Sequence, residues 1–228
     1  MNGQVVKGVQ FVNLKVEGDP AELAADYEDQ GADEVVFLDI TASHENRDTT
    51  LEVVKRTADM ISIPFTVGCG IRNITDIQNA LSSGADKVSV NTAAVNNPSL
   101  VKEAVARFGS EHVAVAIDEK DGKVAVHGWK NKSAMDCLEL AGLFDSMGVG
   151  ALIFTPISVD GTLEGPRIQK TVELMNSVTV PVVASGGVAQ LSDLIALNET
   201  GVWGVIVGTA IYEKKFTVKQ ALEALKGC

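Results

Sequence analysis

The fold is decided by two matching stretches, residues 63–71 (IPFTVGCGI) and residues 180–188 (VPVVASGGV). Each is a short apolar run that leads into a glycine-rich loop, and the two lie 117 positions apart. The same offset relates residues 37–41 (FLDIT) to 154–158 (FTPIS), and residues 84–95 to 201–212. A constant offset over three strand–loop units predicts two half-barrels of four βα units each, and hence an α/β fold of the (βα)8 TIM-barrel type.

The rest of the chain alternates in the same way between short β-branched runs and amphipathic segments, which is typical of a parallel sheet. The predicted strands are Val35–Asp39, Ile63–Val67, Lys87–Val90, Val113–Asp118, Ala151–Thr155, Pro181–Ala184 and Gly204–Val207. Helices are predicted at about 20–30, 48–61, 74–83, 98–108, 133–147, 166–177, 191–199 and 217–226. No linker interrupts this order, so we expect one domain over 1–228, with half-barrels at about 1–110 and 111–228.

The repeat also predicts a missing first strand. Val113–Asp118 leads into the turn DGKV at 121–124, and the matching turn in the first half is NGQV at 2–5. The matching strand, with its terminal acid, is therefore expected just before Met1. Two barrel edges would then stay unpaired unless residues 4–11 fold inward as a replacement strand or another chain fills the gap. A homo-oligomer through the open edge is one expectation.

Composition excludes several classes of protein. Nineteen Lys and Arg against 30 Asp and Glu give a net charge of −11, which argues against nucleic acid as a partner. The apolar runs are too short to span a membrane, and the N-terminus has no signal-peptide core. The three cysteines show no metal spacing, so we expect a reduced, cytoplasmic compartment and neither metal nor cofactor.

Two glycine-rich places at the predicted C-terminal strand ends favour phosphate binding, because glycine lets backbone N–H groups approach an oxyanion. One comprises Gly70 with Asn91 and Thr92; the other comprises Gly161, Gly187, Gly208 and Thr209. The alternative is that these glycines only make tight turns. Their symmetric pairing favours a ligand with a phosphate at each end.

Acid–base candidates are few. Asp118 ends the fifth strand and would point into the barrel mouth, where a carboxylate can move protons; an exposed turn-starting Asp is the alternative. Thr155, at the matching place on the next strand, could donate a hydrogen bond. Lys7 could reach a phosphate or carboxamide, although a solvated lysine is as consistent. Trp129 could stack on a flat ligand ring or anchor its loop.

These residues resemble two sister barrels of histidine biosynthesis, the cyclase subunit of imidazole glycerol phosphate synthase and the phosphoribosylformimino aminoimidazole carboxamide ribotide isomerase. The first half is similar to the cyclase in VVKG at 5–8, FLDITAS at 37–43, PFTVG at 64–68 and GADKVSVNTAA at 84–94. The second half is closer to the isomerase in GW at 128–129, DGTLEGP at 160–166, ASGGV at 184–188 and GVIVGTA at 204–210. The chain therefore resembles a chimera that switches near Asp118.

The resemblance implies roles for the residues that match. Asp118 would be a catalytic acid, and Thr155 and Lys7 would be catalytic residues with it, Lys7 by contacting the substrate. The two glycine-rich places would hold the phosphates of that substrate. Glu34, Asp86 and Lys87 resemble cyclase residues at the opposite face, where a glutaminase subunit docks and ammonia enters. The chain departs from the pattern at Cys69, Ala151 and Pro156. Both sisters also use a second Asp at the end of strand one.

The function that the resemblance implies is a cyclase, a lyase that forms imidazole glycerol phosphate from a bis-phosphate substrate and ammonia. One alternative is the aminoaldose–ketose isomerase that acts on the preceding bis-phosphate intermediate. Another is a barrel that binds phosphate but is catalytically impaired.

Overall fold

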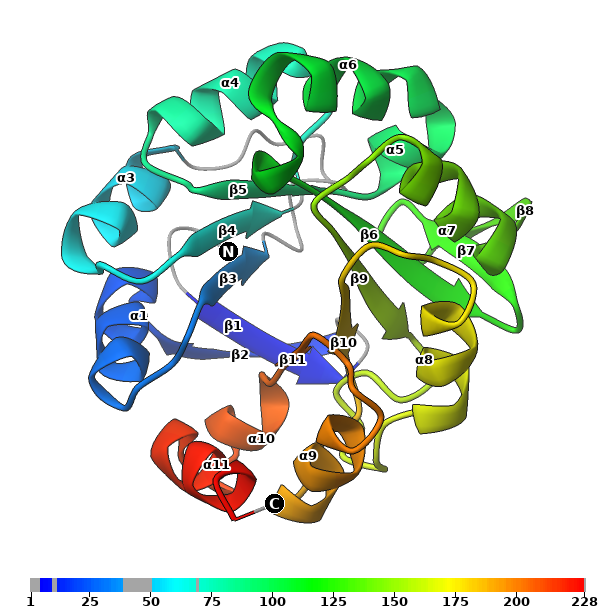
Figure 1. Ribbon diagram of the computed structural model, residues 1–228. Coiled ribbons are helices and arrows are strands. Elements are labelled where there is room, and N and C mark those ends of the chain that lie inside the picture. The colour runs from blue at the N-terminus through cyan, green and yellow to red at the C-terminus, as the bar shows by residue number, and fades with distance from the viewer. Residues whose placement is uncertain (1–4, 10–11, 39–50, 69, 228) are drawn as a thin grey trace.

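Seven parallel strands form the main sheet of the computed structural model, which describes residues 5–9, 12–38, 51–68 and 70–227. They are β3 (Val35–Leu38), β4 (Phe65–Gly68), β5 (Lys87–Val90), β6 (Val113–Lys120), β9 (Ala151–Pro156), β10 (Val182–Ser185) and β11 (Gly204–Ile206). Their order is β11-β10-β9-β6-β5-β4-β3. Viewed along the axis, they curve into a nearly closed barrel ringed by helices (Figure 1). The predicted α/β TIM barrel is confirmed; its division into two half-barrels stays a prediction.

Helices follow the strands and cover the outside of the sheet. They are α1 (Pro20–Asp29), α3 (Leu51–Met60), α4 (Ile74–Ser82), α6 (Pro98–Phe108), α7 (Cys137–Ser146), α8 (Ile168–Met175), α9 (Leu191–Asn198) and α11 (Val218–Leu225). Local signals fix their starts: Asp19 accepts from the N–H groups of Ala21 and Glu22 at α1, and Thr217 forms a capping box at α11. Two short helices, α5 (Thr92–Asn96) and α10 (Thr209–Tyr212), follow β5 and β11.

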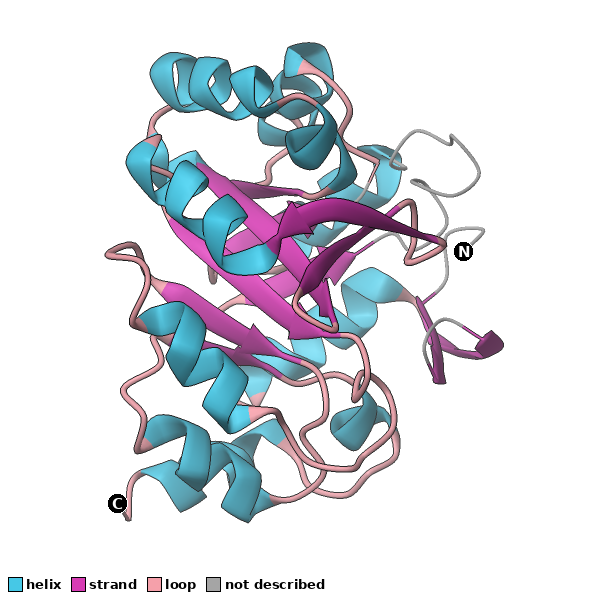
Figure 2. Ribbon diagram, turned by 90° about the vertical axis from the view of Figure 1, so that its right-hand side faces the viewer, coloured by secondary structure: helices cyan, strands magenta, loops and turns pink. Residues whose placement is uncertain are grey.

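One predicted helix begins later than expected. The segment at 133–147 was predicted as helix, but β8 (Asn131–Asp136) pairs antiparallel with β7 (Lys123–Val126), which in turn pairs with the end of β6. The helix starts only at Cys137, because the Asp136 carboxylate accepts the N–H of Leu138 and caps α7 there. The end of β6 therefore continues with β7 and β8 into an antiparallel arm on the main sheet (Figure 2).

The barrel is open between β3 and β11. Near the N-terminus, β1 (Val5–Val9) pairs antiparallel with β2 (Val12–Gly18) in a separate two-stranded sheet. Within the described part of the chain, neither strand pairs with β3 or β11, and the hairpin is set apart from the main sheet (Figure 2). The expectation that residues 4–11 replace the first strand is thus wrong for residues 5–9, which pair with residues 12–18 and with neither open edge of the main sheet.

The core lies mainly between the sheet and the surrounding helices. Val88, Val115 and Leu152 on the strands pack with Ile77 and Phe144 on the helices, and all five are fully buried. Ala114, Ala151 and Ile153 form a separate small cluster on the strands, and all three also line a large cavity. Within the described residues, no helix has the length and apolar character needed to cross a membrane. This packing holds the C-terminal strand ends at one rim.

We predict that Gly150→Ala lowers the free energy of unfolding by about 1–3 kcal/mol. A Cβ on Gly150, just before β9, would lie 2.3 Å from the carbonyl oxygen of Ser110. Chemical denaturation measures the change. Gly142→Ala is the matched control, because a Cβ there meets nothing within 4 Å and alanine favours the helix. Equal stability of the two variants would contradict the steric argument.

Candidate active site at the C-terminal strand ends

The centre of the site is the carboxylate of Asp118, near the end of β6. Parallel pairing places Asp118 directly beside Thr155 of β9. Its Oδ2 accepts a hydrogen bond from Nδ2 of Asn91 at 2.8 Å and another from Nε1 of Trp129 at 2.6 Å. The Thr155 hydroxyl also bonds the carboxylate. The structure therefore brings together four of the residues that the sequence nominates: Asp118, Thr155, Asn91 and Trp129.

The electrostatic setting makes Asp118 able to exchange protons near neutral pH. Its pKa is raised from 3.8 to about 6, chiefly by burial and to a smaller degree by the charge of Asp160, against hydrogen bonds from Trp129, Asn91 and Thr155 that lower it. Desolvation outweighs the donors because the charged form loses most of its water. A carboxylate with a pKa near 6 can both give and accept a proton in the cell's pH range.

Trp129 reaches Asp118 from the turn between β7 and β8. His127, Gly128 and Trp129 all have positive φ, at 56°, 61° and 68°, a conformation that costs a non-glycine residue free energy. The turn is held by the N–H of His127, which donates to Oγ1 of Thr92 at 3.0 Å. The stacking role of Trp129 stays a prediction; in this structure its indole N–H binds the carboxylate.

The two glycine-rich places have matching backbone conformations. Gly70 and Gly187 have φ of 70° and 85°, while Asn91 and Gly208, just before α5 and α10, have φ/ψ of −119°/−93° and −117°/−81°. At Gly187 a Cβ would lie 2.5 Å from the carbonyl oxygen of Gly165, so only glycine fits. Gly70 and Gly187 are both buried, and their matching dihedral angles give the two loops the same backbone shape.

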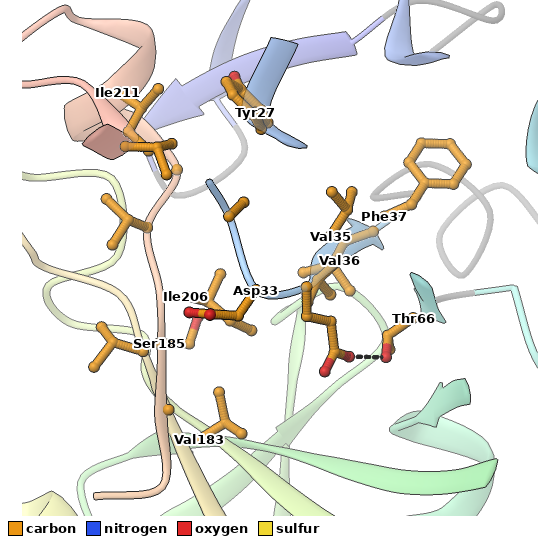
Figure 3. Close-up of a pocket in the computed structure, with 18 of the residues that line it drawn as sticks. Tyr27, Asp33, Val35, Val36, Phe37, Thr66, Val183, Ser185, Ile206 and Ile211 are labelled. Atoms are coloured by element: carbon orange, nitrogen blue, oxygen red, sulfur yellow. Dashed lines mark hydrogen bonds between the residues drawn. The ribbon is translucent and has the colours of Figure 1, made fainter. Parts of the chain in front are cut away.

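A cavity of about 1390 Å³ opens beside the second of these places. Its lining includes Asp160, Gly161, Gly187, Gly208 and Thr209, and it extends to the open edges of β3 and β11. In Figure 3, Ser185 and Ile206 lie on one side of this space and Val35 and Phe37 on the other. The cavity is large because no strand joins the two edges among the described residues.

Asp160 is the titratable residue that sequence reasoning missed. The sequence places Asp160 only within the DGTLEGP stretch at 160–166, which resembles the isomerase. In the structure, burial raises its pKa from 3.8 to about 6. The sequence could have nominated Asp160 as a site residue, because it lies five residues past Thr155, in the loop that follows β9.

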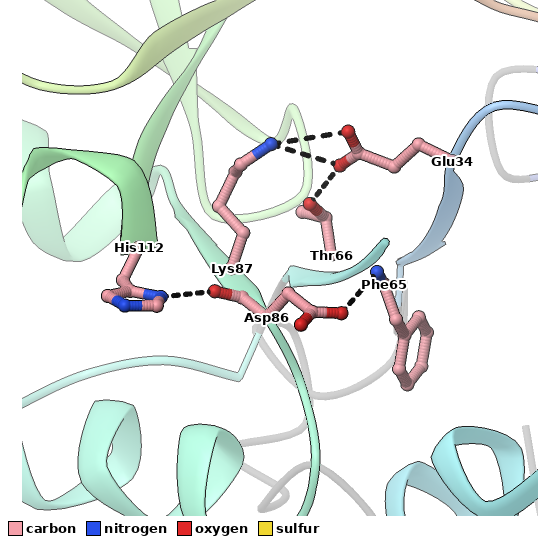
Figure 4. A network of polar contacts seen from close by, with 6 residues as sticks. All are labelled: Glu34, Phe65, Thr66, Asp86, Lys87 and His112. Carbon is pink, nitrogen blue, oxygen red and sulfur yellow. Dashed lines mark hydrogen bonds and ion pairs between the residues drawn. The ribbon is translucent and has the colours of Figure 1, made fainter. Parts of the chain in front are cut away.

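A polar network lies at the opposite end of the strands. The Nζ of Lys87, at the start of β5, is 3.2 Å from the Glu34 carboxylate, which also accepts the hydroxyl proton of Thr66. The Asp86 carboxylate accepts the N–H of Phe65 at 2.8 Å (Figure 4). Glu34, Asp86 and Lys87 are therefore grouped at the N-terminal strand ends, on the face away from Asp118.

Two sequence-nominated features lie partly or wholly outside the described structure. Lys7 belongs to β1, but its side chain is outside the described part, and so is Cys69. Among the described residues, no group of three His, Cys, Asp or Glu side chains could hold a metal ion.

We predict that Asp118→Asn stabilises the protein increasingly as pH rises from about 4 to 7. A carboxyl whose folded pKa is above its unfolded value binds its proton more tightly when folded, so wild-type stability falls through this window. The difference in free energy of unfolding between the variant and the wild type should grow by about 1–3 kcal/mol over this pH range. Urea denaturation at several pH values measures it. Asp121→Asn is the control of opposite sign, because Lys132 lowers the pKa of Asp121.

Comparison with known proteins gives a consistent result. A family model described as histidine biosynthesis protein matches residues 1–217. The imidazole glycerol phosphate synthase subunit HisF of Endomicrobium trichonymphae is 44% identical over 230 aligned positions, which cover 99% of this chain and 88% of that protein. With its α/β barrel and the Asp118 site at the C-terminal rim, the chain belongs to the histidine biosynthesis protein family.

Proposed function

We propose that this barrel acts as an imidazole glycerol phosphate synthase cyclase, joining ammonia to a bis-phosphate substrate. Likeness to the HisF subunit over nearly the whole chain supports the histidine-biosynthesis assignment. The observation that carries the mechanism is Asp118, whose pKa of about 6 is set at a rim between two glycine-rich places. A carboxylate there can move protons while a ligand is held at both ends.

The reaction needs proton transfer at each stage. Ammonia adds to a carbonyl carbon as it loses protons, and the former carbonyl oxygen leaves as water as it gains them. The ionised Asp118 takes a proton from nitrogen. Asn91 and Trp129 donate to its Oδ2 and so fix the orientation of the carboxylate. Thr155 would hold the same carboxylate in place by a hydrogen bond. Lys7 would contact the substrate.

Gly70, Asn91 and Thr92 would receive one phosphate of this substrate, and Gly161, Gly187, Gly208 and Thr209 the other. The matching dihedral angles of the two places support a shared task. The open cavity beside Gly187 and Thr209 gives a ligand access to the second place.

The isomerase remains the second candidate, and Trp129 is the observation that favours it. This indole reaches the catalytic carboxylate, in the loop where the sequence resembles the isomerase. A barrel that binds phosphates without turnover is the third candidate, favoured by the open edge between β3 and β11. Assays of both reactions with purified protein separate the three.

A glutaminase subunit would supply the ammonia by docking at the N-terminal strand ends. Glu34 and Lys87 form an ion pair there, which would sit at the point where ammonia enters the barrel. The open edges of β3 and β11 offer unpaired backbone groups, so we also propose self-association through them; light scattering measures the oligomeric state. The cytoplasm is the compartment that fits this activity.

We predict that Asp118→Asn lowers kcat for ammonia-dependent cyclisation about 10²–10⁴-fold, because the variant cannot take the proton from nitrogen. Steady-state kinetics measure the loss. Asp121→Asn, an exposed acid beyond the end of β6, is the control and should keep the wild-type rate. Turnover of the isomerase substrate alone by the wild type would contradict the cyclase proposal.

We predict that Thr209→Asp weakens binding of a bis-phosphate ligand at least about tenfold, because a carboxylate beside Gly208 repels the second phosphate. Calorimetric titration measures the affinity. Thr217→Asp, which keeps a helix-capping side chain at α11, is the matched control. Unchanged affinity of Thr209→Asp would exclude Gly208 and Thr209 from the phosphate site.

A further inference from the structure

Glu119 follows Asp118 directly on β6 and is buried. Its exposed fraction is 2%, lower than that of any other Asp, Glu, Lys or Arg in the described part of the chain. Neighbouring side chains alternate across a strand, so Glu119 and Asp118 lie on opposite faces of β6. Burying a charged side chain costs free energy unless the charge is paired and hydrogen-bonded. The contacts of Glu119 therefore show what its place in the fold is for.

Three elements of the fold are bonded to Glu119. Its Oε1 accepts from Nζ of Lys170 on α8 at 2.5 Å and from the N–H of Gly122 at 2.6 Å, in the turn between β6 and β7. Its backbone carbonyl accepts the N–H of Ile157 at 3.0 Å, where the loop after β9 begins. The carbonyl of Gly122 accepts in turn from the N–H of Cys137, the first residue of α7, at 3.1 Å. Glu119 thus joins a helix, a hairpin turn and a loop beside the carboxylate of the site.

The turn that Glu119 holds decides where the next turn of the arm falls. Both residues of the β6–β7 turn have positive φ, and Glu119 pairs with Val124 across it. From there β7 runs back along β6 to the turn at residues 127–129. In that turn Trp129 donates to Asp118 at 2.6 Å. Because a slip of one residue in the pairing would reverse the faces of β7, the place of Trp129 depends on the first turn.

Stability alone does not call for an ion pair at this place. A buried ion pair can often be replaced by apolar side chains of similar size without loss of stability. The cross-strand partner Val124 is itself fully buried, so an apolar side chain would suit the surroundings. An apolar side chain could not accept the N–H of Gly122 and bind Lys170 at the same time. These two bonds are what the carboxylate of Glu119 adds to the fold.

We propose that Glu119, held by Lys170, is a positioning residue of this site: it fixes the β6–β7 turn so that Trp129 reaches Asp118. The inference deepens the proposed function and rests on it, since it takes Asp118 as the reacting carboxylate. The bond from Trp129 lowers the pKa of Asp118. A displaced turn would therefore leave this carboxyl less readily ionised and less able to accept a proton.

The test separates positioning from stability by changing both partners of the ion pair. Glu119→Met with Lys170→Met leaves no unpaired buried charge, so urea denaturation should show a stability close to that of the wild type. Trp203→Phe, made in every protein compared, leaves Trp129 as the one tryptophan, and its indole N–H gives a single NMR signal. In the double variant, the change of this signal with pH should shrink by about half or more. The titration midpoint of the Asp118 carboxyl, followed by carbon-13 NMR, should rise by about 0.5 unit or more.

A second variant and a control keep the result decisive. Glu119→Gln with Lys170→Met keeps an oxygen for Gly122 but loses the link to α8, so the midpoint should rise by a smaller amount. Lys132→Met is the matched control, because it removes an exposed ion pair on the same arm, with Asp121 at 2.8 Å, and exposed pairs contribute little. Midpoints that stay at the wild-type value in both double variants would overturn the positioning role.

Turnover gives the second readout. With ammonia and the bis-phosphate substrate, Glu119→Met with Lys170→Met should lower kcat about 10–100-fold with little change in KM, because a small misplacement acts on the chemical step. A wild type without cyclase turnover would overturn the proposed function, whereas the NMR signals would still test the contact between Trp129 and Asp118. An active wild type whose double variant keeps both its rate and its midpoint would overturn the role of Glu119 alone.

Discussion

The parallel pairing of β6 with β5 and β9 is the constraint on which the site depends. Because the three strands run in the same direction, their C-terminal ends meet at one rim, and residues distant in the sequence become neighbours. Pairing of Asp118 with Thr155 and the bond from Asn91 both follow from this register. A shift of one residue would turn Asp118 toward the helices and remove the site.

Burial of a carboxylate costs stability, and here the cost has a chemical use. The desolvation that raises the pKa of Asp118 is only partly offset by three hydrogen bonds, one of them from a turn with three consecutive positive φ angles. The protein therefore combines a buried carboxylate, which is costly to ionise, with a turn at residues 127–129 whose backbone conformation also costs free energy. Such local conflicts with the rules of stable folding are expected at functional sites.

Much of the fold could be predicted from the sequence, because its signals are local or periodic. The apolar runs located all seven strands of the main sheet to within about two residues, and Pro20 and Gly109 marked helix ends where the structure has them. The start of α7 was missed because it depends on pairing between β7 and β8. The pairing of β1 with β2 was missed because pairing partners cannot be read from one strand.

The catalytic carboxylate could be predicted from the sequence, because Asp118 is an acidic residue near the end of a predicted strand. The role of Trp129 as a donor and the burial of Asp160 were not, because each depends on how a loop folds back over the rim. Loop conformation reflects tertiary contacts, such as the bond between His127 and Thr92, that leave no periodic pattern in the sequence.

The order of the strands separates the gap between β3 and β11, called the seam here, from the site around Asp118. In the series β11-β10-β9-β6-β5-β4-β3, β6 is the central strand, so the gap lies across the barrel from Asp118. The direct partners of Asp118 come from the residue after β5, from β9 and from the β7–β8 turn, and none of these borders the gap between β3 and β11. Asp160, by contrast, faces the cavity that extends to the seam. Changes at the gap between β3 and β11 should therefore reach the surroundings of Asp160 before they disturb Asp118.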